Sequence, residues 1–323
     1  MRPEEVGERC AAVIREVEKA IVGKRAIIEM VLATALCGGH VLFEDYPGLA
    51  KTKLAKGVAR ALGCSFKRVQ FTSDLLPADI TGTYVLDRAT GGFEIRKGPI
   101  FTNILLADEI NRAPPKTQSA LLEAMQESQT TLEGESHALP EPFVVLATQN
   151  PIEYEGTYPL PEAQIDRFLV RLRIGYPGKD EEVEILRQRK ERKKEEVDLD
   201  QILDGAQVLE MRRAVEEVHI DPSLQDYAVE IVRRTRSHSQ VEVGASPRGS
   251  LALMHLSSAL AALGKRDYVI PDDVKGCAVP ALAHRIILRP DPWVKGVKPE
   301  AIVTGILEEV PVPKVAKDPE GSG

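Results

Sequence analysis

Apolar residues recur along the start of the chain with the spacing of a helix face. Between residues 4 and 36 they stand three and four positions apart, and the pattern is interrupted once, at the segment IVGK that begins at Ile21. This spacing predicts two amphipathic helices. A short apolar run, HVLFE, comes next and is soon followed by Pro47 and Gly48. Because the run is too short for a helix, it predicts a buried strand that leads into a loop.

Further along, short apolar runs alternate with helix-like segments. Leu54, Val58 and Leu62 share one face of a predicted helix, and Gly63 is expected to end it. Three more runs have the length and apolar character of buried strands, and they are FKRVQF, NILLADEI and FVVLATQNP. The segment KTQSALLEAMQE between the last two has helix spacing. Buried strands that alternate with helices predict an α/β fold, in which a mostly parallel sheet is covered on both faces.

Two other segments alternate apolar and polar residues on either side of a turn. The first, TYVLDRATGGFEIRKG, surrounds Gly91 and Gly92, and the second is TTLEGESHALPEP. This pattern predicts two β-hairpins. The sequence leaves open whether the hairpins are exposed additions to the fold or line a pore or a partner surface.

The composition of the sequence changes after the last of these elements. Residues 179–200 are densely charged and contain few apolar residues, which is typical of solvated helix faces. The segments beyond them have helix spacing, around residues 204–218, 222–238, 247–263, 271–286 and 299–309. We therefore predict an α/β domain over residues 1–190, a smaller all-helical domain over 191–313 and a flexible tail over 314–323.

Composition restricts the classes of function. The 323 residues carry a formal charge of −7, which argues against a chain whose whole surface binds nucleic acid. The four cysteines contain no C-x-x-C pair, so neither a zinc ribbon nor a disulfide framework is indicated. The first residues lack the apolar core of a secretion signal, and no run approaches the roughly 18 apolar residues of a membrane span. The simplest expected location is the cytoplasm.

The loop after the first predicted strand is similar to a phosphate-binding loop in which two glycines are replaced. The pattern G-x-x-x-x-G-K-[ST] is met at Lys51 and Thr52, and Gly48 lies within it, but Asp45 and Ala50 occupy the two glycine positions. Loop amides and the start of the following helix favour anions, the lysine neutralises phosphate charge, and the threonine hydroxyl can bind Mg²⁺. The alternative is an ordinary turn whose lysine points to water.

Two other strand ends carry residues suited to the same chemistry. Asp108 and Glu109 follow the apolar run ILLA, at the edge of the sheet where ligands of α/β folds bind. Asp108 could hold Mg²⁺, and Glu109 could polarise an attacking water. Asn150 ends the next buried strand and could orient that water. The alternative is that these are solvated acids and a turn residue.

Two arginines raise separate questions. Arg167 could reach the γ-phosphate of a neighbouring subunit as an arginine finger, or form a salt bridge to an acid such as Asp166. Arg248 follows Ser246 and Pro247, which are expected to be the N-cap and first residue of a helix. A cation in the first turn is disfavoured by the helix dipole, so a phosphate bound there would remove the conflict.

Together these segments resemble the MoxR family of AAA+ ATPases. The matching segments span most of residues 20–260 in the expected order, and they are IVGK, EDYPGLAKT, LLADEINRAPPKTQSALLEAMQE, ATQNP, TYPLPEAQIDRF and GASPRGSLAL. The resemblance implies an AAA+ αβα sandwich with a parallel sheet, followed by a smaller all-α lid domain. It also implies that the hairpins near residues 72–97 and 130–142 are the helix-2 insert and the pre-sensor hairpin of an AAA+ core.

The resemblance implies a role for each candidate residue, with ATP and Mg²⁺ as cofactors. Thr52 and Asp108 would bind the metal. Catalysis would depend on Glu109, on Asn150 as sensor 1, on Arg167 as the arginine finger and on Arg248 as sensor 2. Val22 and Gly23 would flank the adenine. The full set of implied nucleotide-binding residues is Val22, Gly23, Pro47, Gly48, Leu49, Ala50, Lys51, Thr52 and Lys53.

The implied activity is Mg²⁺-dependent ATP hydrolysis by a ring, expected to be a hexamer, that remodels or matures client proteins. The family also suggests a partner protein with a von Willebrand A domain. Three alternatives stay open, namely a motor subunit of a metal chelatase, a motor of a nucleic-acid-processing complex and a nucleotide sensor with little turnover. The absence of Lys and Arg from the second hairpin argues against nucleic acid. Ala50 suits the sensor, because its methyl group narrows the phosphate cradle.

Overall fold

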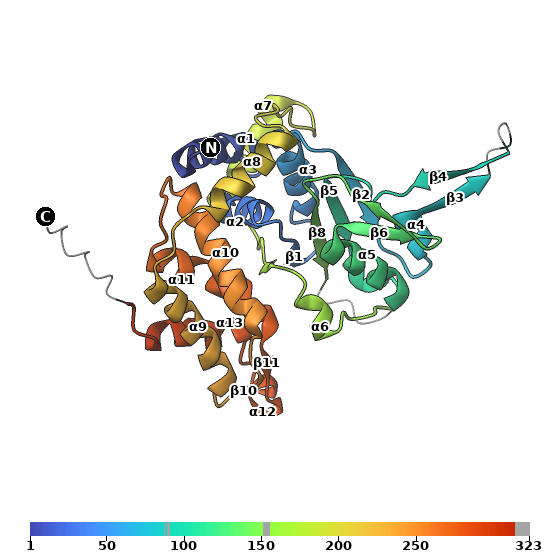
Figure 1. Cartoon of the computed structure of the whole chain (residues 1–323). Coiled ribbons are helices and arrows are strands. Elements are labelled where there is room, and N and C mark those ends of the chain that lie inside the picture. Colours follow the sequence, from blue (N-terminus) through green and yellow to red (C-terminus); the bar gives the residue numbers. More distant parts are fainter. Residues whose placement is uncertain (87, 89–90, 151–155, 314–323) are drawn as a thin grey trace, which may run out of the picture. The chain divides into compact units, whose positions relative to one another are not determined.

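The computed structural model describes residues 1–86, 88, 91–150 and 156–313, so the predicted tail, 314–323, lies outside the described residues (Figure 1). The chain divides into two compact units, the first made of Met1 and Glu8–Arg213 and the second of Arg2–Gly7 and the residues from Ala214 onward. In the described part of the chain, no helix combines the length and apolar character needed to cross a membrane.

The division between the units falls after Arg213, later than the boundary expected at residue 190. The reason is apolar burial. Leu203, Val208 and Met211 are almost completely buried and line a small apolar cavity with residues of the first two helices. The charged stretch that suggested the boundary is instead helix α7 (Lys179–Arg192), an element within the first unit.

The first unit is built around a five-stranded parallel sheet, as the sequence predicted. Its strand order is β2-β5-β8-β1-β9. The strands are β1 (Val41–Glu44), β2 (Phe66–Gln70), β5 (Ile104–Asp108), β8 (Val144–Gln149) and β9 (Val170–Leu172). Nearly every residue of β1, β5 and β8 is buried, because both faces of a parallel sheet are covered. The continuous apolar runs of the sequence are the result.

Helices of the first unit pack on this sheet. Leu121 and Leu122 of α5 belong to one buried apolar cluster with Leu105 of β5 and Val145 of β8, and this cluster forms the core on that face. The helices that begin in residues 3–205 are α1 (Pro3–Glu18), α2 (Arg25–Leu36), α3 (Lys51–Ala61), α4 (Pro77–Thr81), α5 (Pro115–Glu127), α6 (Glu162–Ile165), α7 and α8 (Gly205–Glu216). A short 3-10 turn, Ile110–Arg112, follows β5.

Both predicted hairpins are confirmed. Strands β3 (Gly82–Leu86) and β4 (Phe93–Lys97) pair antiparallel, as do β6 (Gln129–Leu132) and β7 (Glu135–Ala138). Figure 1 shows β3 and β4 extending away from the sheet. The hydroxyl of Tyr84 on β3 donates to Glu135 of β7 at 2.8 Å, so the two hairpins contact each other.

The second unit is mainly helical, as expected. Ser246 caps α10 by accepting a hydrogen bond from the Arg248 amide, and Pro247 is the first helical residue, which confirms the predicted helix start. An antiparallel pair, β10 (Val241–Val243) and β11 (Ile287–Leu288), was not predicted. The helices are α9 (Pro222–Ser237), α10 (Pro247–Leu263), α11 (Pro271–Leu282), α12 (Pro290–Val294) and α13 (Pro299–Glu309).

Candidate active site

The loop between β1 and α3 forms one wall of a cavity of about 380 Å³ at the carboxyl ends of the strands. Parallel strands present these ends at one edge of the sheet, and ligands of α/β folds bind there. The cavity is lined by Asp45, Pro47, Gly48, Leu49, Ala50, Lys51, Thr52, Lys53, Arg68, Asp108, Glu109, Thr148 and Asn150. The three predicted strand ends therefore meet at one place.

Asp45, at the first glycine position of the loop pattern, stabilises the loop. Its carboxylate accepts hydrogen bonds from the amides of Tyr46 at 3.0 Å and of Gly175 at 2.7 Å. Lys51 also donates to the main-chain carbonyl of Asp45. The acid is thus bonded to the protein main chain, which explains how the loop forms without a glycine here.

Ala50, at the second glycine position, adopts a left-handed conformation with φ 58° and ψ 20° and caps the start of α3. Gly48 in the same loop has φ 84°. A residue with a Cβ is strained at such angles by about 1 kcal/mol, whereas glycine is not. The backbone of this loop therefore keeps the shape of a glycine-containing phosphate loop at the expense of local strain.

This strain gives a first prediction. Ala50→Gly should raise the melting temperature by about 2–4 °C, because relief of the left-handed alanine is worth about 1 kcal/mol. Gly48→Ala is the matched control and should lower the melting temperature. Differential scanning calorimetry of both variants measures the effect. A melting temperature for Ala50→Gly at or below that of the wild type would contradict the interpretation.

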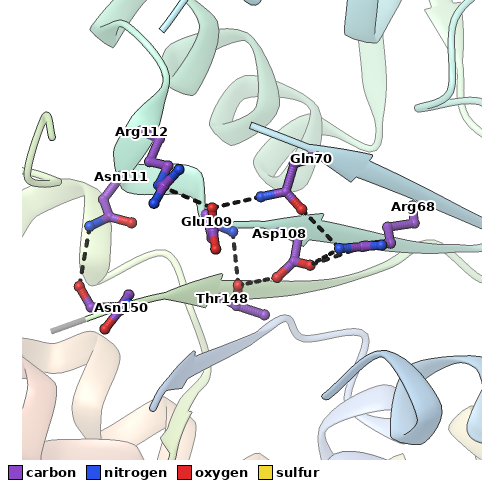
Figure 2. A network of polar contacts seen from close by, with 8 residues as sticks. All are labelled: Arg68, Gln70, Asp108, Glu109, Asn111, Arg112, Thr148 and Asn150. Carbon is purple, nitrogen blue, oxygen red and sulfur yellow. Dashed lines mark hydrogen bonds and ion pairs between the residues drawn. The ribbon is translucent and has the colours of Figure 1, made fainter. Parts of the chain in front are cut away.

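Asp108 ends β5 with both carboxylate oxygens bonded. Oδ1 accepts from the hydroxyl of Thr148 at 2.6 Å. Oδ2 accepts from the guanidinium of Arg68, from Nε at 3.0 Å and from Nη2 at 2.7 Å (Figure 2). Thr148 is almost completely buried in β8, so it fixes the orientation of the Asp108 carboxylate.

Glu109 follows Asp108 and is held by three contacts. Its amide donates to Thr148 Oγ1 at 2.8 Å. Its carboxylate accepts from Gln70 Nε2 at 2.7 Å and forms an ion pair with Arg112 at 3.0 Å (Figure 2). The backbone of Glu109 is left-handed, with φ 56° and ψ 51°. A strained glutamate that the surrounding structure keeps in place is a candidate functional residue.

Asn150 and Lys51 complete the polar lining. Asn150 is buried at the end of β8, and its carbonyl accepts from the side chain of Asn111 at 3.4 Å. Burial lowers the pKa of Lys51, and the nearby carboxylates of Asp45, Asp108 and Glu109 oppose this effect. Bound phosphate would add to that opposition and favour the charged lysine.

The donor set suits Mg²⁺. Thr52 and Asp108 both line the cavity and offer a hydroxyl and a carboxylate, which are hard oxygen ligands. Within the described residues, no group of three His, Cys, Asp or Glu side chains forms a metal cage. Mg²⁺ in phosphate-transferring sites is usually held by one or two protein ligands together with substrate phosphates, so these residues fit the ion.

Some predicted residues lie outside the described lining of this cavity. Val22 and Gly23 belong to the first unit but are not among the lining residues, and a Cβ on Gly23 would come within 1.9 Å of Glu181 Oε1. Arg167 donates to the carbonyl of Leu122 at 2.9 Å. Arg248 belongs to the second unit. The adenine, arginine-finger and sensor-2 roles of these residues remain predictions.

Four residues that contact the acids directly were missed from the sequence, and they are Arg68, Gln70, Arg112 and Thr148. The sequence did contain a signal for Arg68, Gln70 and Thr148, namely polar residues two positions apart on one face of a strand. Arg68 and Gln70 have this spacing, and so do Thr148 and Asn150. The order of the strands, which brings them to the acids, was not visible in the sequence.

Comparison with known proteins agrees with this architecture. A family described as "ATPase family associated with various cellular activities (AAA)" matches residues 40–170, and one described as "AAA lid domain" matches residues 233–306. The crystal structure of a Cytophaga hutchinsonii protein is similar, with a TM-score of 0.90, 41% identity and 97% of each chain covered. Fold and site thus define an AAA+ ATPase with a lid domain.

Two relatives identify the family more closely. YeaC of Bacillus subtilis is 49% identical over 300 residues, and the match covers 93% of each chain. "Chaperone MoxR1" of Mycobacterium tuberculosis is 42% identical over 316 residues, which cover 95% of this chain and 83% of the relative. The chain belongs to the MoxR family of AAA+ ATPases.

Proposed function

We propose that this ATPase hydrolyses Mg²⁺·ATP in the cavity beneath the β1–α3 loop and works as a ring, a hexamer, that remodels or matures client proteins. One observation carries the proposal. Residues at or just after the ends of three strands line one cavity, and they are Lys51, Thr52, Asp108, Glu109 and Asn150. These are the residue types that phosphoryl transfer to water needs.

Each side chain has a task in this proposal. Lys51 and the amides around Gly48 hold the β- and γ-phosphates, while Thr52 and Asp108 hold the ion that neutralises phosphate charge. Glu109 accepts a hydrogen bond from the attacking water and polarises it. Asn150 orients the same water. Thr148 keeps the two acids in position through its bonds to both of them.

In this mechanism, each subunit needs an arginine from its neighbour in the ring to complete its active site. Arg167 is bonded to Leu122 of its own chain, and we propose that it acts on the nucleotide of the neighbouring subunit. Arg248 is proposed to contact the phosphates from the lid, and Val22 and Gly23 to flank the adenine. The chaperone name of one relative supports action on client proteins. A protein with a von Willebrand A domain is the proposed partner.

Mixing two inactive variants tests the ring. Arg167→Ala and Lys51→Ala should each lower turnover by about 10³-fold or more, because each removes a charge that stabilises the transition state. In a randomly mixed ring, about a quarter of the interfaces pair an intact site with an intact arginine from the neighbour. We therefore expect mixing to restore about a quarter of wild-type phosphate release.

A mass tag on one of the two variants serves as the control for subunit exchange, because exchange produces rings of intermediate mass. Mass photometry establishes that the variants assemble. Mixed rings that form but stay inactive would contradict the action of Arg167 on a neighbouring site.

A further inference from the structure

Arg68 connects the two acids of the candidate site. Its strand, β2, is the parallel neighbour of β5, and Arg68 stands opposite Leu106, two residues before Asp108. Its Nη2 donates both to Asp108 Oδ2, at 2.7 Å, and to Gln70 Oε1, at 2.9 Å (Figure 2). The amide of Gln70 in turn donates to Glu109 at 2.7 Å. One guanidinium thus contacts the proposed metal ligand and orients the amide that holds the proposed catalytic acid.

The contacts of Asp108 leave little room for another cation. Oδ1 is bonded to the buried Thr148 hydroxyl, and Oδ2 accepts two bonds from Arg68. The carboxylate is 16% exposed, whereas the Arg68 side chain is 47% exposed. Arg68 is therefore the partner that can swing into solvent, while Thr148 keeps Asp108 in place. A metal ion that binds at Oδ2, directly or through a water, requires Arg68 to leave.

We propose that Arg68 is a built-in competitor of Mg²⁺ for Asp108, so that binding of the metal at this carboxylate requires the displacement of Arg68. The inference rests on the proposed Mg²⁺·ATP site and adds a regulatory step to it. Arg68 is a positioning residue in this scheme.

Metal affinity tests the competition without measuring turnover. Mn²⁺ serves as the probe, and electron paramagnetic resonance of full-length protein with saturating ADP gives the half-saturating Mn²⁺ concentration. Arg68→Gln should lower this concentration about three- to tenfold, the range expected when a partly exposed ion pair no longer competes. Lys67 is an exposed residue of β2 whose side chain lies on the face opposite Arg68, so Lys67→Gln removes the same charge and should leave the concentration unchanged.

The direction of the change makes the test specific. Damage to the fold would weaken Mn²⁺ binding, so tighter binding cannot come from a misfolded variant. An Arg68→Gln protein that binds Mn²⁺ like the wild type, or more weakly, would overturn the competition, and so would an equal gain in Lys67→Gln. If the wild type itself binds no Mn²⁺ with ADP, the proposed Mg²⁺ site fails together with the inference.

The conservative variant tests whether the positive charge at position 68 competes with the metal. Arg68→Lys keeps a cation beside Asp108 but lacks the fork that reaches Asp108 and Gln70 together. Its half-saturating Mn²⁺ concentration should therefore stay closer to that of the wild type than the value for Arg68→Gln. Equal values for the two variants would show that charge at this position does not compete with the metal.

Discussion

Replacement of Glu109 by Gln should reduce ATP turnover by about 10²–10⁴-fold, the usual contribution of a positioned general base, and leave ATP binding intact. Gln has the size of Glu and can still accept the hydrogen bond from Gln70 Nε2 through its remaining carbonyl oxygen. It lacks the negative charge that polarises water. The fold and the phosphate loop are untouched, so the loss should fall on the chemical step.

Two measurements separate binding from chemistry in this variant. Isothermal titration calorimetry gives the ATP dissociation constant, and steady-state phosphate release gives turnover. Glu127→Gln is a suitable control, because it removes the same charge from the exposed end of α5, outside the described lining of the cavity. Turnover of Glu109→Gln within threefold of the wild type would exclude Glu109 as the polarising base.

The fold was predictable where the physical signal extends over many residues. β5 and β8 are continuous apolar runs because both faces of the parallel sheet are buried, and α10 repeats apolar residues along its whole length. The elements missed are short. β11 has two residues and α12 has five, so neither is long enough to repeat the pattern of its element. Tertiary contacts, rather than local sequence, set such elements.

The site was predictable where its chemistry stands on adjacent residues. Two pairs of adjacent residues could be recognised from the sequence alone. Lys51 and Thr52 stand at a helix start, and Asp108 and Glu109 stand at a strand end. Arg68 and Gln70 belong to the site through register, since Gln70 lies opposite Asp108 in the pairing of β2 with β5. The sequence of β2 does not indicate which strand lies next to it in the sheet. Residues that act on a site from an adjacent strand therefore need the structure.

Ala50 is a third case, in which the residue departs from the motif while the backbone keeps the conformation that the motif requires. The loop pattern demands a glycine there, and the structure gives alanine the left-handed angles that the pattern implies. The main-chain shape of the loop is thus determined by its surroundings, including the bonds from Asp45 to Tyr46 and Gly175. A departure from a motif at one residue need not alter the geometry that the motif encodes.

Replacement of Lys51 by Ala should weaken ATP binding about 10- to 100-fold, because a charged hydrogen bond of about 1.5–3 kcal/mol to the phosphates is lost. Lys51 is half-buried among three carboxylates, so its removal also leaves the cavity with an excess of negative charge that repels the triphosphate. Turnover should fall further than binding, by about 10³-fold or more, because the lysine also stabilises the charge of the transition state. This distinguishes Lys51 from Glu109, whose replacement should affect turnover alone.

Lys56→Ala is the matched control, since Lys56 is an exposed lysine of the same helix α3 that pairs with Glu196. Fluorescence anisotropy with a labelled ATP analogue measures both variants under the same conditions. Lys56→Ala should bind like the wild type. If Lys51→Ala also binds like the wild type, the phosphates do not lie in the β1–α3 loop. The roles proposed for Thr52, Asp108 and Glu109 would then be wrong as well, because all three are assigned from the same position of the bound triphosphate.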